Sequence, residues 1–166
     1  MDHLSIRDEI EELLKSPKLN SSESLNEVNK NLWKPVISQI EERFIQKKHY
    51  NNSMHWGWQR LKEPLYVLRL VDASFRYMKY FVKDDLVWFI VEDYQDKMWL
   101  YEGNINFITK SIIPELKHLR EYYLVSKKFE WLLCNNHHDI VFGSGSAVVN
   151  EMKKFEQFNS EEIIRN

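Results

Sequence analysis

The feature that most constrains the fold is a series of short apolar runs, separated by short polar turns, in the second half of the chain. Residues 122–125 and 129–133 flank three polar residues, and residues 86–91 and 98–101 flank the polar insert 93–97. Runs of this length, rich in β-branched and aromatic residues, are typical of strands, and turns this short join antiparallel neighbours. The sequence therefore predicts two β-hairpins within one antiparallel sheet.

The first 50 residues have a different, helical pattern. Ser5 and Asp8 form a helix-opening box, and apolar residues then recur at helical spacing: Ile6, Ile10, Leu13 and Leu14. A second helical pattern starts at about Ser24 and contains Pro35, where the helix either kinks or restarts. After the strands, Ser146 is expected to open a last helix.

These patterns predict one α+β domain that spans residues 1–166. N-terminal helices occupy residues 1–50. The part at 64–158 holds an antiparallel sheet of four to six strands, covered by helices on one face. The polar tail at 159–166 is expected to fray.

Charge and cysteine content limit the location and the partners. The chain has 23 Lys and Arg against 25 Asp and Glu, a formal charge of −2, which argues against nucleic acid and anionic membranes as partners. No window approaches 18 apolar residues, so no membrane span is expected. The single cysteine, Cys134, allows no intrachain disulfide and fits the reducing cytoplasm. We expect no cofactor, and the oligomeric state stays open.

The segment Asn135-Asn136-His137-His138-Asp139 is one candidate site. Imidazoles serve as metal ligands or general bases, and Asp139 is placed to orient one of them. Adjacent side chains on a strand point to opposite faces, so His137 and His138 can share a ligand only if they lie in a turn. Without a third ligand at a diagnostic spacing, we expect no metal site and favour a polar turn between strands.

Two further segments are candidates for binding a protein. Trp56, Trp58 and Arg60 are residue types that anchor interfaces, although the same aromatics can pin an irregular loop onto the core. Glu92, Asp93 and Asp96 lie at the hairpin around 93–97. They suit a basic partner, or they keep a solvated hairpin tip soluble.

Two segments suggest chemistry but fit a structural role better. Gly143-Ser144-Gly145-Ser146 lies between a strand and a helix, as a phosphate-binding loop would, but no Lys follows it. We interpret it as a turn. Cys134, among apolar neighbours, is interpreted as a buried structural thiol.

The runs VWFIVEDYQDKMWLYEG at 87–103 and EYYLVSKKFEWLLCNNHHDIVFGSG at 121–145 resemble an uncharacterised family of small proteins from Gram-positive bacteria. The organisation is also similar to cytosolic immunity proteins that neutralise toxins, such as the large family related to a yeast cell-wall synthesis regulator. That family's proline-containing segment followed by a glycine-rich one is not found here, so its binding surface is not transferred to this chain.

The leading functional hypothesis is a non-enzymatic protein-binding domain, an immunity protein or regulator whose partner is a toxin or effector protein. It depends on the mild acidity, the lack of an assembled catalytic motif and the aromatic segment at 54–60. The alternative is a small metal-dependent hydrolase or nucleotide-processing enzyme centred on His137, His138 and Asp139.

Overall fold

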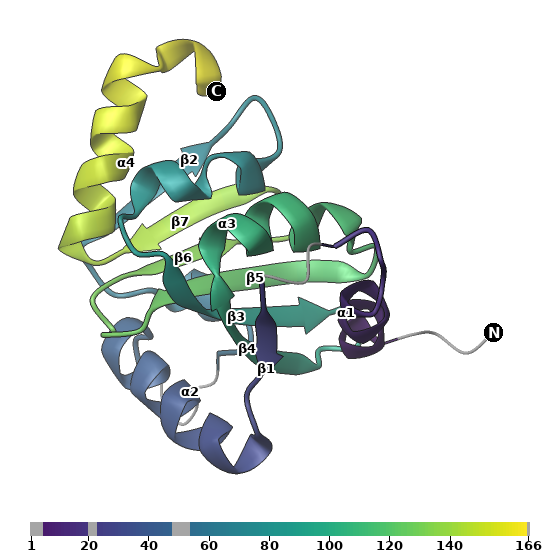
Figure 1. Ribbon diagram of the computed structural model, residues 1–166. Coiled ribbons are helices and arrows are strands. Elements are labelled where there is room, and N and C mark those ends of the chain that lie inside the picture. Colours follow the sequence, from purple (N-terminus) through teal and green to yellow (C-terminus); the bar gives the residue numbers. More distant parts are fainter. Residues whose placement is uncertain (1–4, 20–22, 48–53, 166) are drawn as a thin grey trace.

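The protein is a single seven-stranded sheet with helices packed on it, seen in a computed structural model that describes residues 5–19, 23–47 and 54–165 (Figure 1). The strand order is β1-β4-β3-β5-β6-β7-β2, and every neighbouring pair is antiparallel. The α+β class is therefore confirmed, with seven strands rather than four to six. The strands are β1 (Leu25–Glu27), β2 (Leu65–Arg69), β3 (Leu86–Asp93), β4 (Met98–Asn104), β5 (Leu119–Ser126), β6 (Leu132–Asn135) and β7 (Ile140–Ser144).

In the described part of the chain, four α-helices and several shorter turns lie before, between and after the strands. The α-helices are α1 (Ile6–Leu14), α2 (Lys30–Phe44), α3 (Ile105–Phe107) and α4 (Ser146–Phe158). A π-helix, η4 (Ile108–Ile112), follows α3, and the 3₁₀ turns are η1 (Gly57–Arg60), η2 (Ser74–Arg76), η3 (Met78–Phe81), η5 (Ile113–Glu115) and η6 (Ser160–Glu162). Within the described ranges no helix has the length and apolar character to cross a bilayer.

Helices cover both faces of the sheet, not one face as the sequence predicted. Side chains alternate across each strand, so Phe89 and Ile90 of β3 enter different apolar clusters. Ile90 packs in the cluster that holds Ile40 and Phe44 of α2. Phe89 packs in the larger cluster formed with α1, η3, α3, η4 and α4. Figure 1 shows α4 beside β2 and β7, with α2 well away from it.

Strand β1 replaces the start of the second expected helix. Leu25 is buried and pairs with Gly103 of β4. A Cβ atom on Gly103 would lie 2.8 Å from Leu25 Cδ1, so the glycine permits this close approach. The helix begins only after Asn29, whose side chain accepts a hydrogen bond from the Asn31 amide. α2 then continues through Pro35 as one element. Tertiary pairing has overridden local helical spacing here.

The C-terminal residues contact the end of β2. Ile163 bridges to Leu70, and the Tyr77 hydroxyl donates to Glu162 Oε2 at 2.5 Å. Residues 160–165, which we expected to fray, therefore contact the edge of the sheet.

A bulge in β5 shapes the surface near the β3–β4 hairpin. Glu92 pairs with Glu121, but the next pair is Asp93 with Leu119, so Arg120 is the extra residue on β5. Bulges re-aim side chains and often lie next to functional sites. Here the bulge places Arg120 beside the hairpin.

Candidate functional site

Two carboxylates are buried next to each other on the α2 face of the sheet. Glu92 on β3 and Glu121 on β5 are directly opposite in register, which places their Cβ atoms about 5 Å apart. Their exposed fractions are 0% and 1%. Glu92 is two residues after Ile90 and Glu121 is two residues before Tyr123, and both of these apolar residues are buried in the α2-side cluster. Acidic side chains are rarely this buried unless a partner compensates their charge.

Each carboxylate meets one imidazole near the surface. His137 Nδ1 lies 2.7 Å from Glu121 Oε1, within hydrogen-bonding distance. His55 Nδ1 lies 3.0 Å from Glu92 Oε1. The two imidazole side chains are 26% and 33% exposed, whereas the carboxylates are almost fully covered. We call these four residues, His55, Glu92, Glu121 and His137, the carboxylate–imidazole cluster.

Three of the four carboxylate oxygens of the cluster lack a hydrogen-bond donor within the described residues. Within the described residues, neither oxygen of Glu92 accepts a hydrogen bond, and Glu121 Oε2 accepts none. Burial raises the pKa of Glu92 to about 7, and the negative charge of Glu121 adds to this effect while Arg120 opposes it. Uncompensated buried carboxylates are costly, so this arrangement points to a proton, a cation or a ligand as the compensating group.

Tryptophan side chains form the wall of the cluster. The Trp56 ring centroid lies 5.7 Å from His55 and 5.6 Å from His137, and both contacts are edge-to-face. The Trp58 centroid lies 6.0 Å from His137. Arg120 stacks over Trp56, with its Cζ atom 4.5 Å from the ring centroid. The two tryptophans, expected as partner anchors, are half-buried here and contact the imidazoles.

Local contacts hold the η1 segment in place. The Arg60 side chain donates to the carbonyls of Gln46 and His55, at 3.3 and 3.5 Å. Trp58 packs on Phe142 of β7, with 5.5 Å between centroids. Arg60 therefore supports the backbone that carries the site. The irregular stretch expected at 49–64 lies partly outside the described residues, at 49–53.

The hairpin acids have different positions. Asp93 Oδ1 accepts hydrogen bonds from the amides of Gln95 and Lys97, so it closes the turn between β3 and β4. Asp96 has a positive φ of 59°. Its Oδ1 atom accepts from Arg120 at 2.6 Å and lies 3.9 Å from His55 Nε2. Asp96 thus faces the cluster, while Asp93 stabilises the loop.

The histidine segment forms a turn, which brings the two imidazoles together. The ring centroids of His137 and His138 are 3.9 Å apart. Asp139, with a φ of 55°, accepts a hydrogen bond from Asn135 at 2.9 Å. Asp139 therefore supports the turn, and Glu121, not Asp139, contacts His137.

Sequence reasoning did not single out Glu121, His55 or Arg120 as site residues. Glu121 opens an otherwise apolar run, and a carboxylate at an inward-facing strand position is a usable signal. Its pairing with Glu92 depends on the register between β3 and β5. No pattern in the sequence indicates the bulge that positions Arg120.

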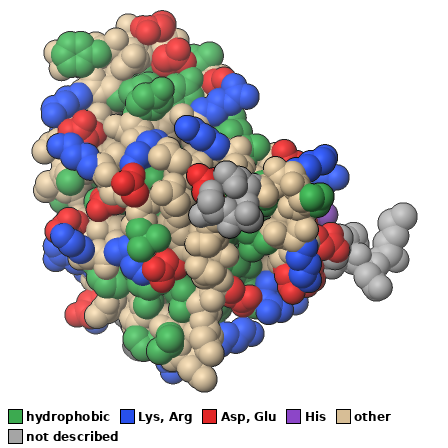
Figure 2. Space-filling view, in the orientation of Figure 1, with side chains coloured by type: hydrophobic (Ala, Val, Ile, Leu, Met, Phe, Trp, Pro, Cys, Tyr) green, Lys and Arg blue, Asp and Glu red, His purple; other side chains and the backbone are tan. Residues whose placement is uncertain are grey.

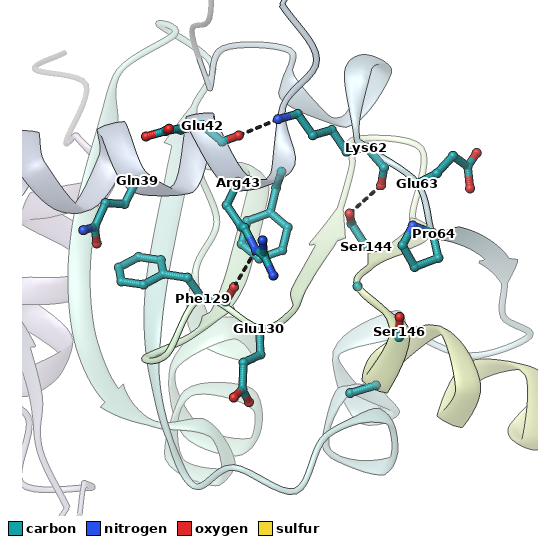
Figure 3. Close-up of a pocket in the computed structure, with 13 residues that line it drawn as sticks. Gln39, Glu42, Arg43, Lys62, Glu63, Pro64, Phe129, Glu130, Ser144 and Ser146 are labelled. Carbon is teal, nitrogen blue, oxygen red and sulfur yellow. Dashed lines mark hydrogen bonds between the residues drawn. The ribbon is translucent and has the colours of Figure 1, made fainter.

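A separate cavity of about 780 Å³ lies between α2 and the start of α4, and none of its lining residues belongs to the cluster (Figure 3). Arg43 and Lys62 line it, but each donates to a backbone carbonyl, of Phe129 and of Glu42. Ser144, which we considered for a phosphate loop, donates to the Lys62 carbonyl. The side chains of Arg43, Lys62 and Ser144 therefore already donate hydrogen bonds to backbone carbonyls. Figure 2 shows basic and acidic side chains interspersed over the face in view.

The cluster contains the groups that activate water. A buried carboxylate that holds an imidazole in one orientation makes that imidazole an effective general base. Carboxylates and imidazoles are also the ligands of zinc, manganese and iron. Cys134 is fully buried, and burial raises the pKa of its thiol well above the ordinary value, so it is not a candidate nucleophile.

Comparison with known proteins gives a family but no characterised relative. Neither the curated proteins nor the solved structures contain a match. A family of unknown function matches residues 2–156, which include every residue of the cluster. The chain therefore belongs to this family of unknown function, DUF6756.

Proposed function

We propose that the protein is a small hydrolytic enzyme whose reactive centre is the carboxylate–imidazole cluster. The observation that carries this proposal is the contact of 2.7 Å between His137 Nδ1 and Glu121 Oε1, made by a buried carboxylate to a partly exposed imidazole. Glu121 fixes the orientation of the ring. Nε2, the other ring nitrogen, is then the atom that can take a proton from water.

The surroundings support water, not a side chain, as the nucleophile. The only thiol is buried, and the wall of Trp56 and Trp58 contacts His137 edge-on. Arg120 is stacked on Trp56, the same ring that contacts His137, and it carries a positive charge to this wall. A fixed cation stabilises the negative charge that develops on a substrate oxygen during hydrolysis.

Removing the imidazole is expected to reduce hydrolysis strongly. Against a panel of nitrophenyl acetate, nitrophenyl phosphate and bis(nitrophenyl) phosphate, we expect His137→Ala to lower kcat/KM for the accepted substrate by about 10²- to 10⁴-fold, as for loss of a general base. Glu121→Gln should cause a smaller loss, because it affects the orientation of the ring. Release of nitrophenolate at pH 7.5 is the measurement.

The matched control is His118→Ala. His118 also meets one carboxylate, with Nδ1 3.0 Å from Glu9 Oε1, but it is outside the cluster and more exposed. Its removal should leave hydrolysis unchanged. If the wild-type protein hydrolyses none of the three compounds, or if His137→Ala retains full activity, the enzymatic proposal is wrong.

A second candidate, a protein-binding immunity protein or regulator, is favoured by the β3–β4 hairpin tip. Tyr94 there is 68% exposed, and Asp96, two residues further along the same turn, has a side chain that is 52% exposed. An exposed aromatic beside an acid suits a basic protein surface. Under this second proposal, the chain is a cytoplasmic protein of Gram-positive bacteria, and its partner is a toxin or effector protein.

The binding candidate predicts a partner that depends on the hairpin tip. Tagged protein should capture one stoichiometric protein from lysate of its native source, and Tyr94→Ala should reduce the captured amount at least about tenfold, as for an interface anchor. His137→Ala should leave capture intact. Capture that is equal for wild type and Tyr94→Ala would exclude the hairpin as the interface.

A further inference from the structure

We propose that His55, Glu92 and Asp96 bind one divalent transition-metal ion of the zinc or manganese type. One ligand atom from each of these residues lies within 4.8 Å of the other two. They come from three different places, namely the turn before η1, β3 and the turn between β3 and β4. The inference deepens the proposed function. The catalytic role of the ion rests on that proposal, whereas the test of metal binding does not.

The buried carboxylate is the strongest reason for a cation. The Glu92 side chain is 1% exposed, and neither of its oxygens accepts a hydrogen bond within the described part of the chain. Glu121 lies directly opposite and adds a second negative charge. Two carboxylates buried at one position are unfavourable, and only Glu121 has a hydrogen-bond partner among the described residues, His137. A divalent ion bound between imidazole and carboxylate ligands would neutralise the negative charge that remains.

The distance between His55 and Glu92 suits two ligands of one ion. His55 Nδ1 and Glu92 Oε1 are 3.0 Å apart, yet the pair does not have hydrogen-bond alignment. Two atoms that each bind an ion at about 2.1 Å are separated by roughly 3.0–3.5 Å in octahedral or tetrahedral geometry. The spacing thus matches coordination at a shared point.

The hairpin supplies the third ligand and the opening to solvent. Asp96 is held by Arg120 at Oδ1, so binding through Asp96 requires that oxygen to be shared or the second oxygen, Oδ2, to be used. Its side chain is 52% exposed. One nitrogen and two carboxylates leave coordination positions for water, as in catalytic metal sites. The Glu121–His137 pair stands next to this site and remains available as the base.

The test measures metal content and affinity, not activity. Protein purified without chelator should contain one zinc or manganese ion per chain by plasma mass spectrometry. After EDTA treatment and desalting, calorimetric titration with ZnCl₂ should show one site of micromolar or tighter affinity. Glu92→Gln should weaken this affinity by at least about 100-fold, since loss of groups that merely support a ligand already costs 10- to 100-fold. Cobalt(II) should give visible absorption bands that Glu92→Gln abolishes.

Two control variants separate this site from other histidines. His118→Ala, which removes an imidazole–carboxylate contact outside the cluster, should leave zinc affinity unchanged. His137→Ala should keep zinc but lose hydrolysis, so the metal site and the catalytic proposal can fail independently. Glu92→Gln differs little in shape from the wild type, and its circular dichroism in EDTA verifies the fold.

Two results would overturn the metal site. One is a wild-type protein that is purified without metal and whose affinity for zinc and manganese is no higher than that of Glu92→Gln. The other is zinc that is lost in a His137→Ala/His138→Ala double variant but retained in Glu92→Gln, because this pattern assigns the ion to the exposed turn, where the two rings are 3.9 Å apart.

Discussion

Metal-free protein is expected to become less stable as the pH rises from 5 to 8. The Glu92 pKa is raised to about 7 in the folded protein, first by burial and then by the charge of Glu121, against an unfolded value of about 4.3. Between these two values the folded state holds a proton that the unfolded state has released. Stability therefore falls as the pH rises through this window and levels off above pH 7. We expect a decrease of about 1–3 kcal/mol from this group.

Urea unfolding in EDTA, followed by tryptophan fluorescence from pH 5 to 8, measures this decrease. Other groups titrate as well, so the informative quantity is the difference between wild type and Glu92→Gln. The amide cannot ionise, and the variant should be the more stable protein at pH 8. Parallel curves for the two proteins would show that Glu92 ionises without loss of stability. Added zinc should reverse the trend at pH 8, because a metal ion competes with the proton.

Replacing Gly145 by Ala is expected to destabilise the protein by about 2–4 kcal/mol. Gly145 precedes α4 with a φ of 107°, a backbone region that other residues rarely adopt. A Cβ atom would also lie 2.5 Å from the Glu130 carbonyl oxygen. Because that atom is backbone, relief of the clash requires the β5–β6 connection to move. The lowered urea midpoint at pH 7 is the measurement.

Ser146→Ala is the control for the glycine variant. Ser146 is the next residue, exposed in the first turn of α4, and its replacement should change stability by less than about 0.5 kcal/mol. A Gly145→Ala protein as stable as Ser146→Ala would show that the turn before α4 relaxes without penalty.

Local patterns in the sequence predicted the elements that depend on local physics. The capping box of Ser5 and Asp8 is present, and the hairpin expected around 93–97 joins β3 and β4. Long-range pairing explains the main error in the first half of the chain. Leu25 has helical spacing with Val28 and Leu32, but its burial against Gly103 of β4 determines its conformation.

The candidate site was visible in the sequence only as separate pieces. His137, Trp56 and Glu92 were each noted, in segments far apart along the chain. The fold brings them to one place because β3 and β5 are neighbours and the turn after β6 reaches η1. Glu121 was overlooked because a charged residue at a strand end is ordinarily solvated, and only the register shows that it is buried against Glu92.

The strand order has a consequence for synthesis of the chain. The edge strands β1 and β2 come from the first 69 residues, and they pair with β4 and β7, which end at residues 104 and 144. A ribosome releases the N-terminus first. Both edge strands therefore leave the exit tunnel before their partners are synthesised. β1 can pair once β4 has emerged, whereas β2 stays unpaired until β7, the last strand of the sheet, has emerged.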